Sequence, residues 1–357
     1  MRVVQLIDSL EAGGAERMAV NIANGLLSEF SFSALVTTRK EGALKKSLHK
    51  KIIYSFIEKK STLDIHSIFK LRYFLIENKI EIIHAHGTSY FYAVLVKLIY
   101  HKIKIIFHDH NGNRVNLKRS NTILKLFSFL FSGVFTVNET LQKWAQKELS
   151  CKMVCFIPNF AIENHNEIAT TQLKGESGKR IICLANLRNP KNHITLLKSF
   201  YASDARKKGW TLHLIGTDNN DAYSTILKQF IKDNNIENKV FFYGSCNDVG
   251  LILKQGNIGV LSSTYEGFPV TLLEYGLNKL AVISTNVGYC KTVLEHETTG
   301  MLFHPEMQDE LTNCLNMLIN NTYLCEKLST NFHTFVMSNY SEKIIVKKII
   351  QQYTKVL

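Results

Sequence analysis

The sequence predicts an α/β protein built from two doubly wound, Rossmann-like domains that face a central cleft. Short β-rich runs alternate with longer helical patterns, the series occurs twice, and a polar stretch near residues 162–179 separates the two series. Alternating strands and helices are typical of a parallel sheet that helices cover on both faces. The length of 357 residues also fits two domains, because a domain commonly holds about 100–200 residues.

The first half contains six predicted strands. They are Val3–Ile7, Ala34–Thr37, Glu81–Ala85, Lys104–His108, Gly133–Val137 and Met153–Ile157. A helix is predicted over Ala15–Phe30, because apolar residues recur there at helical spacing. Its apolar face is formed by Met18, Ile22, Leu26 and Leu27.

The second half repeats this pattern after the polar stretch. Its predicted strands are Arg180–Ala185, Thr211–Ile215, Val240–Tyr243, Ile258–Leu261, Ala281–Ser284 and Met301–Phe303. Helices are predicted at Ile194–Tyr201, Leu272–Leu277 and Ser341–Leu357. We therefore expect domains over residues 1–162 and 163–335, followed by a C-terminal helix within residues 336–357 that packs back on the first domain.

The net charge of +13 is carried almost entirely by the first half. Residues 1–160 hold 23 basic and 12 acidic residues, whereas residues 161–357 hold 20 and 18. The seven cysteines include no CxxC pair, which favours reduced thiols in a cytoplasmic protein over disulfides or zinc. No apolar run reaches the roughly 18–20 residues of a membrane span, so the protein is expected to attach at most to the inner face of a membrane.

The most informative motif follows the fourth predicted strand of the second half. Glu266 opens the pattern E-G-F-P-x4-E, which ends at Glu274. Pro269 suits the first turn of a helix, so a helix is predicted to begin near Phe268. The start of this helix, through Val270, would offer backbone N–H groups to a phosphate, and the glutamates would then face sugar hydroxyls. An ordinary solvated helix is the alternative.

Two further loops contain residues suited to anions. Arg188 and Lys191 are three residues apart on a loop that enters a helix near His193, and two cations there can neutralise a diphosphate. Gly13 and Gly14 form the first strand-to-helix turn, where the backbone can approach a ligand closely. A surface pair of cations and a purely steric glycine turn are the alternatives.

Histidines cluster at the ends of two predicted strands. His84 and His86 alternate on one strand, whereas His108, Asp109 and His110 end the next. The carboxyl ends of parallel strands meet at one edge of a sheet, so these side chains are expected on the cleft side. A metal site is the alternative, but no acidic or thiol residue completes a ligand set, and we expect no metal.

Taken in order, these motifs resemble those of family-4-type retaining glycosyltransferases, which have the GT-B fold. Smaller matches lie at Ile157–Asn159, Phe242–Ser245 and Asn286–Gly288. The family pattern then continues with a second glycine and a glutamate, where this chain has Tyr289 and Thr292. No acidic role can therefore be assigned to this loop.

The resemblance implies a role for each motif. The residues implied in catalysis are His108 and Glu266. Those implied in binding the donor diphosphate are Gly14, Arg188, Lys191, Phe268, Pro269 and Val270. Those implied in binding the donor ribose and base are Glu274, Gly244 and Ser245. Those implied in binding the acceptor are Gly13, His84, Asp109 and His110.

The implied reaction transfers a sugar from a nucleotide-diphosphate donor to a hydroxyl group of a glycan or lipid-linked acceptor, with retention of configuration, in polysaccharide or lipid-linked glycan assembly. The sequence contains no DxD pair, so we expect neither a metal ion nor a cofactor. A sugar-nucleotide epimerase of the same fold is an alternative that would need no acceptor. The positive charge also raises nucleic-acid binding, but no recognised motif supports it and we expect no such partner.

Two stretches combine basic and apolar residues, at residues 39–60 and 117–131. Each is expected to be either a solvated helix with one side toward the core or a surface that meets anionic lipid. The second possibility would account for the charge of the first half, the predicted acceptor domain.

Overall fold

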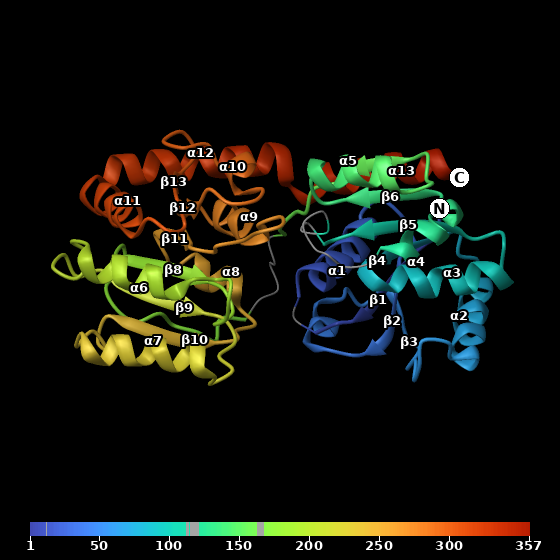
Figure 1. Cartoon of the computed structure of the whole chain (residues 1–357), viewed down its shortest axis with the longest axis horizontal. Helices are drawn as coiled ribbons and strands as arrows, with labels where there is room; N and C mark the ends of the chain where they lie inside the picture. The colour runs from blue at the N-terminus through green and yellow to red at the C-terminus, as the bar shows by residue number, and fades with distance from the viewer. Residues whose placement is uncertain (12, 112–113, 115–120, 163–167) are drawn as a thin grey trace. The chain divides into compact units, whose positions relative to one another are not determined.

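A computed structural model describes residues 1–11, 13–111, 114, 121–162 and 168–357 (Figure 1). The chain divides into two compact units. Unit 1 comprises Met1–Phe160 together with Glu342–Leu357, and unit 2 comprises Ala161–Ser341. Unit 2 extends beyond the expected end at residue 335, because helix α12 (Thr322–Tyr340) continues without a break to that point.

Unit 1 contains a parallel sheet of seven strands in the order β3-β2-β1-β4-β5-β6-β7. The strands are β1 (Val3–Ser9), β2 (Ala34–Lys40), β3 (Ile53–Phe56), β4 (Ile82–His86), β5 (Lys104–Asp109), β6 (Gly133–Thr136) and β7 (Val154–Phe156). The strand order reverses between β1 and β4. In doubly wound sheets, ligands bind beyond the carboxyl ends of the strands at such a reversal.

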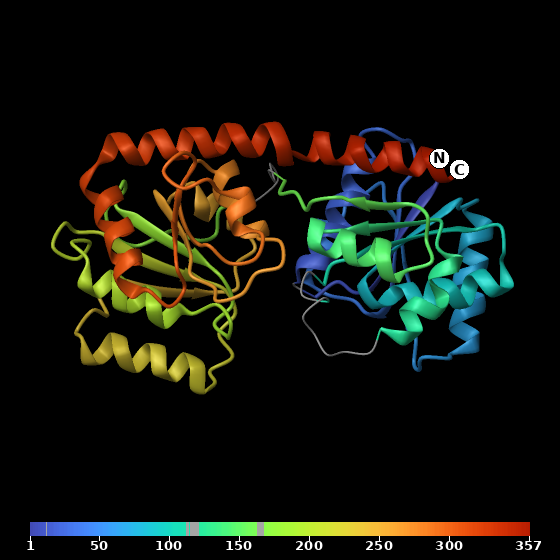
Figure 2. The ribbon, with the colours of Figure 1, turned by 45° about the horizontal axis from the view of Figure 1, so that its top comes forward.

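Helices cover both faces of this sheet. They are α1 (Gly14–Leu26), α2 (Ile65–Glu77), α3 (Tyr90–Ile99), α4 (Thr122–Phe127), α5 (Glu139–Glu148) and α13 (Glu342–Val356), with short 3-10 turns at η1 (Ala43–Ser47), η2 (Gly87–Ser89) and η3 (Ser128–Leu130). Successive strand residues point to opposite faces. Leu6 and Ala85 therefore pack with α2 to α5, whereas Ile7 and Leu35 pack with α1. Figure 2 shows α13, in red, along unit 1; it packs against α1, where a Cβ on Gly25 would touch Val346.

The stretch 39–60 is not the expected helix. It contains the end of β2, the turn η1 and the edge strand β3, which pairs with β2. Its apolar residues Leu44, Leu48 and Ile52 pack on the core beneath α1 rather than facing solvent. The expectation failed because β3 is an edge strand within a run of lysines, so it lacks the continuous apolar pattern of the central strands.

Unit 2 contains a parallel sheet of six strands in the order β10-β9-β8-β11-β12-β13. The strands are β8 (Arg180–Leu184), β9 (Thr211–Ile215), β10 (Val240–Gly244), β11 (Ile258–Leu261), β12 (Ala281–Thr285) and β13 (Met301–Phe303). The helices are α6 (His193–Ala202), α7 (Ala222–Asp233), α8 (Val249–Leu253), α9 (Val270–Leu277), α10 (Cys290–Val293), α11 (Gln308–Asn320) and α12. All six strands expected for this half are present.

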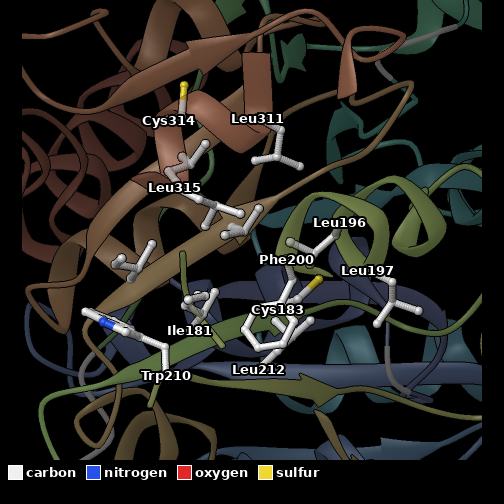
Figure 3. Close-up of a cluster of buried hydrophobic side chains, with 14 of the residues drawn as sticks. Ile181, Cys183, Leu196, Leu197, Phe200, Trp210, Leu212, Leu311, Cys314 and Leu315 are labelled. Carbon is white, nitrogen blue, oxygen red and sulfur yellow. The ribbon is translucent and has the colours of Figure 1, made fainter. Parts of the chain in front are cut away.

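The main core of unit 2 lies where α6 and α11 pack on one face of the sheet (Figure 3). Ile181 and Leu212 on the strands meet Phe200 on α6 and Leu315 on α11. These four side chains are fully buried. The packing fixes the strand ends from which the loops of the site emerge. Across the described residues, no helix combines the length and the apolar character that a membrane span needs.

Candidate functional site

Two loops at the carboxyl ends of β8 and β11 bring expected site residues together in unit 2. The two strands pair directly, so the loops that follow them are neighbours. Thr264 donates its backbone N–H to the Pro190 carbonyl at 2.9 Å. The Ser262 hydroxyl donates to the Lys191 carbonyl, also at 2.9 Å. These bonds tie Lys191 to the loop that leads into α9.

Lys191 and Glu266 form an ion pair at this point. The Lys191 Nζ lies 2.6 Å from Glu266 Oε1, and the two side chains are only 24% and 12% exposed. Such partial burial shields the pair from the solvent screening that weakens surface pairs. Arg188 lies three residues before Lys191 and is exposed, and its guanidinium has no polar partner within the described chain. The loop therefore presents one paired and one unpaired cation.

The loop after β12 supports the backbone of Glu266. Gly288 has a φ of +52°, and a Cβ there would lie 1.9 Å from the Glu266 carbonyl oxygen, so only glycine fits. The ring of Tyr289 stacks on Phe268 with 5.2 Å between centroids. Tyr289 stands where the family pattern has its second glycine. Its ring packs on Phe268, two residues before the start of α9.

Helix α9 begins at Val270, two residues later than expected, and Pro269 is its N-cap. No side chain caps this end of the helix. Pro269 has no N–H, and the Val270 N–H already bonds to the Phe268 carbonyl at 3.0 Å. These two residues therefore have no free N–H for a phosphate in this structure. Glu274 lies on the second turn and is half-buried.

The residues expected near the nucleotide base lie farther along the sheet. Gly244 ends β10 with a φ of +67°, and Ser245 after it is exposed. β9 lies between β10 and β8, and no hydrogen bond or ion pair within the described chain joins Gly244 or Ser245 directly to Lys191 or Glu266. Sequence reasoning missed Gly216, which links the two regions. A Cβ on Gly216 would lie 2.2 Å from the Ala185 carbonyl, and its N–H bonds to the Gly244 carbonyl at 2.8 Å.

Three buried polar atoms at these strand ends have no hydrogen-bond partner among the described residues. They are His193 Nε2, Ser263 Oγ and Thr285 Oγ1. Burial lowers the pKa of His193 to about 4, so its ring is neutral at pH 7. Buried polar groups are normally paired, so this group indicates a place where a polar ligand could bind. None of the three was a candidate from the sequence.

In unit 1, the first turn leaves room beside its glycines. Gly13 caps α1 and Gly14 is the first residue of the helix. A Cβ on Gly14 would meet no atom within 4 Å, and one on Gly13 would meet the flexible Glu16 side chain. No packing contact in the described part of unit 1 therefore requires glycine at position 14. A glycine at this position would instead let a ligand approach the backbone closely.

Asp8, near the end of β1, is a site candidate that sequence reasoning missed. Its carboxylate accepts hydrogen bonds from Thr38 at 2.6 Å and Thr88 at 2.5 Å. The Lys59 Nζ lies 4.0 Å away, and that side chain is only 6% exposed. An acidic residue directly after the apolar part of the first strand is the sequence signal that could have indicated it.

Four histidines at the ends of β4 and β5 form two hydrogen-bonded pairs. His84 Nε2 lies 3.1 Å from His108 Nδ1, and His86 Nδ1 lies 2.8 Å from His110 Nε2. Burial lowers the pKa of His110 to about 3 and the pKa values of the other three well below the usual range. All four rings are therefore neutral at pH 7.

Two side chains from other elements close this cluster. Tyr353 on α13 places its Oη 2.6 Å from His84 Nδ1. Gln5 on β1 places Oε1 2.9 Å from His86 Nε2 and Nε2 3.5 Å from the Tyr353 hydroxyl. Neither Tyr353 nor Gln5 was a site candidate from the sequence. We refer to Tyr353, Gln5 and the four histidines as the histidine network.

The same histidines have a spacing that could suggest a metal site. One ring nitrogen each of His84, His86 and His108 lies within 4.8 Å of the others. However, His84 and His86 use both ring nitrogens in hydrogen bonds, and their rings stack at 17° to one another. Stacked rings direct their lone pairs in parallel rather than toward one ion. The geometry fits a hydrogen-bond network better than a metal site.

Asp109 is held by its own chain. Arg114 contacts Oδ2 through Nε and Oδ1 through Nη2, the latter at 3.0 Å, and the Asn111 N–H bonds to Oδ1 at 3.0 Å. Burial raises the pKa of Asp109, and Arg114 opposes this shift. Both carboxylate oxygens therefore already accept hydrogen bonds from groups nearby in the chain.

Comparisons with known proteins give the class of the chain. The family model described as glycosyltransferase family 4 matches residues 12–161, and the one described as glycosyl transferases group 1 matches residues 164–334. An uncharacterized glycosyltransferase of Haemophilus influenzae is 24% identical, over 97% of this chain and 96% of that protein. The crystal structure of Anabaena HepE in complex with UDP and glucose has a TM-score of 0.83 at 17% identity, and the match covers 99% of this chain and 100% of that one.

A relative with a named reaction is the N,N'-diacetylbacillosaminyl-diphospho-undecaprenol alpha-1,3-N-acetylgalactosaminyltransferase of Campylobacter jejuni, which is 23% identical over 70% of this chain and 68% of that protein. The two parallel sheets and the structural matches show that the chain has the GT-B fold. The two family models together span both units, and the chain belongs to the family-4-type glycosyltransferases.

Proposed function

We propose that the chain transfers a hexosyl group from a nucleotide-diphosphate donor to a hydroxyl group of a glycan or lipid-linked acceptor, with retention of configuration and without a metal ion. The observation that carries this proposal is the Lys191–Glu266 pair beside the unpaired Arg188. Two cations suit a diphosphate, and a carboxylate suits the hydroxyl groups of the attached sugar.

The chemistry follows from the charges. As the bond between sugar C1 and the diphosphate oxygen breaks, negative charge develops on the leaving group, and Arg188 and Lys191 stabilise it. The diphosphate then competes with Glu266 for Lys191, which frees the Glu266 carboxylate to accept hydrogen bonds from the sugar. The acceptor oxygen bonds to C1 and its proton passes to the leaving phosphate. His108 would contact the sugar, as the resemblance implies.

Relatives support the classes of donor and acceptor. Anabaena HepE was crystallised with UDP-glucose, which supports a UDP-hexose donor. The name of the Campylobacter relative gives a lipid-diphosphate acceptor and N-acetylgalactosamine as the transferred sugar, which supports a lipid-linked acceptor. The two cations of the β8 loop also support a donor that carries a diphosphate.

The test is a transfer assay with a panel of UDP- and GDP-sugars and lipid-linked acceptors. Removal of one leaving-group cation is expected to lower kcat by about 100-fold or more, so Arg188→Ala and Lys191→Ala should each be severely impaired. Lys232→Ala, which removes an exposed cation at the end of α7, serves as the matched control and should leave the rate unchanged. Full activity of both site variants would show that the site is assigned wrongly.

The same assay tests the finer parts of the proposal. The NMR coupling of the anomeric proton in the product reports retention or inversion. Treatment with a chelator should leave the rate unchanged, and a strict need for a divalent ion would contradict the proposed mechanism. Epimerised sugar nucleotide formed without any acceptor would favour the epimerase alternative instead.

We also propose that unit 1 meets an anionic membrane surface on the cytoplasmic side, through helices α2, α3 and α4 rather than through residues 39–60. Residues 117–120 of the predicted stretch 117–131 lie outside the described residues, whereas α4 and η3 are described. The exposed apolar residues on these helices and turns are Leu63, Ile65, Phe69, Tyr73, Ile76, Leu98, Ile99, Ile123, Leu126 and Phe129. They include 10 of the 19 large exposed apolar residues of the described chain.

The three helices are neighbours in unit 1. The Arg72 side chain on α2 donates to the Ile99 carbonyl at the end of α3, and Phe91 on α3 contacts Phe127 on α4 with 5.9 Å between ring centroids. Figure 1 shows the three helices together on unit 1. Residues 60–130 carry 11 basic and 4 acidic residues, so the same region supplies the charge that attracts anionic lipid.

A further inference from the structure

The Gln5 side chain fixes the proton positions in one half of the histidine network. Its Oε1 can only accept a hydrogen bond, so His86 must donate from Nε2. A neutral imidazole carries one proton, so His86 Nδ1 holds a lone pair and accepts from His110 Nε2. His110 Nδ1 is then left with a lone pair, and no described residue bonds to it.

The Tyr353 hydroxyl fixes the other half. Its oxygen faces the Gln5 amide N–H, so its own proton is directed to His84 Nδ1. His84 therefore carries its ring proton at Nε2 and donates to His108 Nδ1. His108 must hold its proton at Nε2, which is buried and has no acceptor in the described chain.

The outcome is two open nitrogens of opposite character on adjacent rings. His108 Nε2 is a hydrogen-bond donor and His110 Nδ1 is an acceptor, and the two rings lie 4.0 Å apart between centroids. A hydroxyl group both accepts and donates, so it satisfies both nitrogens. A carboxylate or a phosphate only accepts, so it would leave the His110 lone pair facing negative charge.

We propose that Tyr353 and Gln5 are positioning residues that set the tautomers of the histidine network, so that His108 and His110 together bind a neutral sugar hydroxyl and reject an anionic group at that position. The identity of the ligand rests on the glycosyl transfer proposed above, whereas the proton positions do not depend on it. It also gives the C-terminal helix a role in the site, since Tyr353 lies on α13.

The proton positions can be measured directly in the full-length chain by ¹H–¹⁵N NMR with ¹⁵N-labelled histidine, because the two tautomers give different nitrogen shifts and couplings. We expect His84, His86, His108 and His110 all to be neutral and protonated at Nε2. Tyr353→Phe should shift the signals of His84 and His108 and leave those of His86 and His110 in place. Gln5→Leu should shift the signals of His86 and His110 most, and those of His84 and His108 less, because the Gln5 amide also faces the Tyr353 hydroxyl.

The selective effect of Tyr353→Phe on His84 and His108 separates tautomer control from a general loss of packing, which would move all four signals. In the transfer assay, Tyr353→Phe should lower kcat by about tenfold while the KM for the donor changes little, since one hydrogen bond that orients His108 is lost. Tyr323→Phe removes the hydroxyl of an exposed tyrosine on α12 and should change neither readout.

Two results would overturn the proposal. One is a wild-type spectrum with His108 protonated at Nδ1, as the opposite orientation of the Gln5 amide and the Tyr353 hydroxyl would give. The other is a Tyr353→Phe chain whose His84 and His108 signals or whose kcat are unchanged. A failure of the proposed function looks different, because the wild-type spectrum would then be as expected while no sugar nucleotide supports transfer.

Discussion

Lys191 and Glu266 are 75 residues apart in the chain, and their charged atoms lie 2.6 Å apart in the structure. Two backbone features hold them there. Hydrogen bonds from Ser262 and Thr264 fix the β8 loop, and the close approach of Gly288 fixes the Glu266 carbonyl. The geometry of the pair therefore depends on a glycine that carries no chemistry of its own.

Gly288→Ala is expected to destabilise unit 2 by roughly 2–4 kcal/mol, because the new Cβ meets the Glu266 carbonyl and alanine is strained at positive φ. Transfer should fall further than the stability loss explains, since the Glu266 loop must move. Urea unfolding and the transfer rate measure the two effects.

Gly178→Ala is the matched control for this prediction. Gly178 also has a positive φ, of +90°, but a Cβ there would meet no atom within 4 Å. It should cost only about 1–2 kcal/mol from backbone strain and leave the transfer rate unchanged. If both variants lose the same stability and the same activity, the close contact between position 288 and Glu266 is not the reason that glycine is needed there.

At the scale of elements, α2 is a helix with two apolar sides. Leu71, Phe74 and Leu75 are buried against the sheet, whereas Phe69 and Tyr73 are 54% and 67% exposed on the opposite side. A surface helix ordinarily places polar residues on its outer side. The second apolar side is the structural reason to expect a partner for α2, and the surrounding lysines and arginines favour an anionic bilayer.

The double variant Phe69→Glu/Tyr73→Glu is expected to lose binding to vesicles of phosphatidylcholine with phosphatidylglycerol by at least about tenfold. Burial of one such side chain contributes about 1.5–3 kcal/mol, and the added charges repel the lipid. Sedimentation with vesicles measures the bound fraction. Wild-type binding should also weaken with added salt.

The matched control places the same charges on unit 2. Ile226 and Tyr323 are 59% and 75% exposed there, so Ile226→Glu/Tyr323→Glu should leave vesicle binding unchanged. Equal binding to pure phosphatidylcholine, or equal loss in both double variants, would contradict a specific anionic lipid surface on α2.

At the scale of the whole molecule, the last helix belongs to the unit where the chain begins. α13 buries Ile345, Val346, Ile349 and Tyr353 in unit 1. At about 1.5–3 kcal/mol for each side chain, this burial contributes roughly 6–12 kcal/mol, which is comparable to the entire stability of a domain, about 5–15 kcal/mol.

Removal of residues 342–357 is therefore expected to unfold unit 1 and leave unit 2 folded. Calorimetry of the truncated chain should lose one of two unfolding transitions. Removal of Leu357 alone, which is 55% exposed, should change neither transition. A truncated chain that keeps both transitions would show that α13 is not needed for the fold of unit 1.

The sequence was sufficient for the fold class because central strands of a parallel sheet are continuous apolar runs. Five of the six strands predicted in the first half keep their bounds within two residues, and β2 extends three residues past its expected end at Thr37. β3 was missed because an edge strand with half-exposed residues lacks that signal. The start of α9 was misplaced by two residues because Pro269 fits both the N-cap and the first turn.

The sequence by itself determined the two α/β domains, the family-4-type motifs and the identity of the residues at the ends of β8, β11, β4 and β5, because strand periodicity and loop chemistry are local properties of the chain. Only the tertiary structure decided which side chains meet. The bonds from Lys191 to Glu266 and from Tyr353 to His84 join segments far apart in sequence, and the pairing of whole strands and helices sets their distances. The free nitrogens of His108 and His110 are likewise known only once their neighbours are in place.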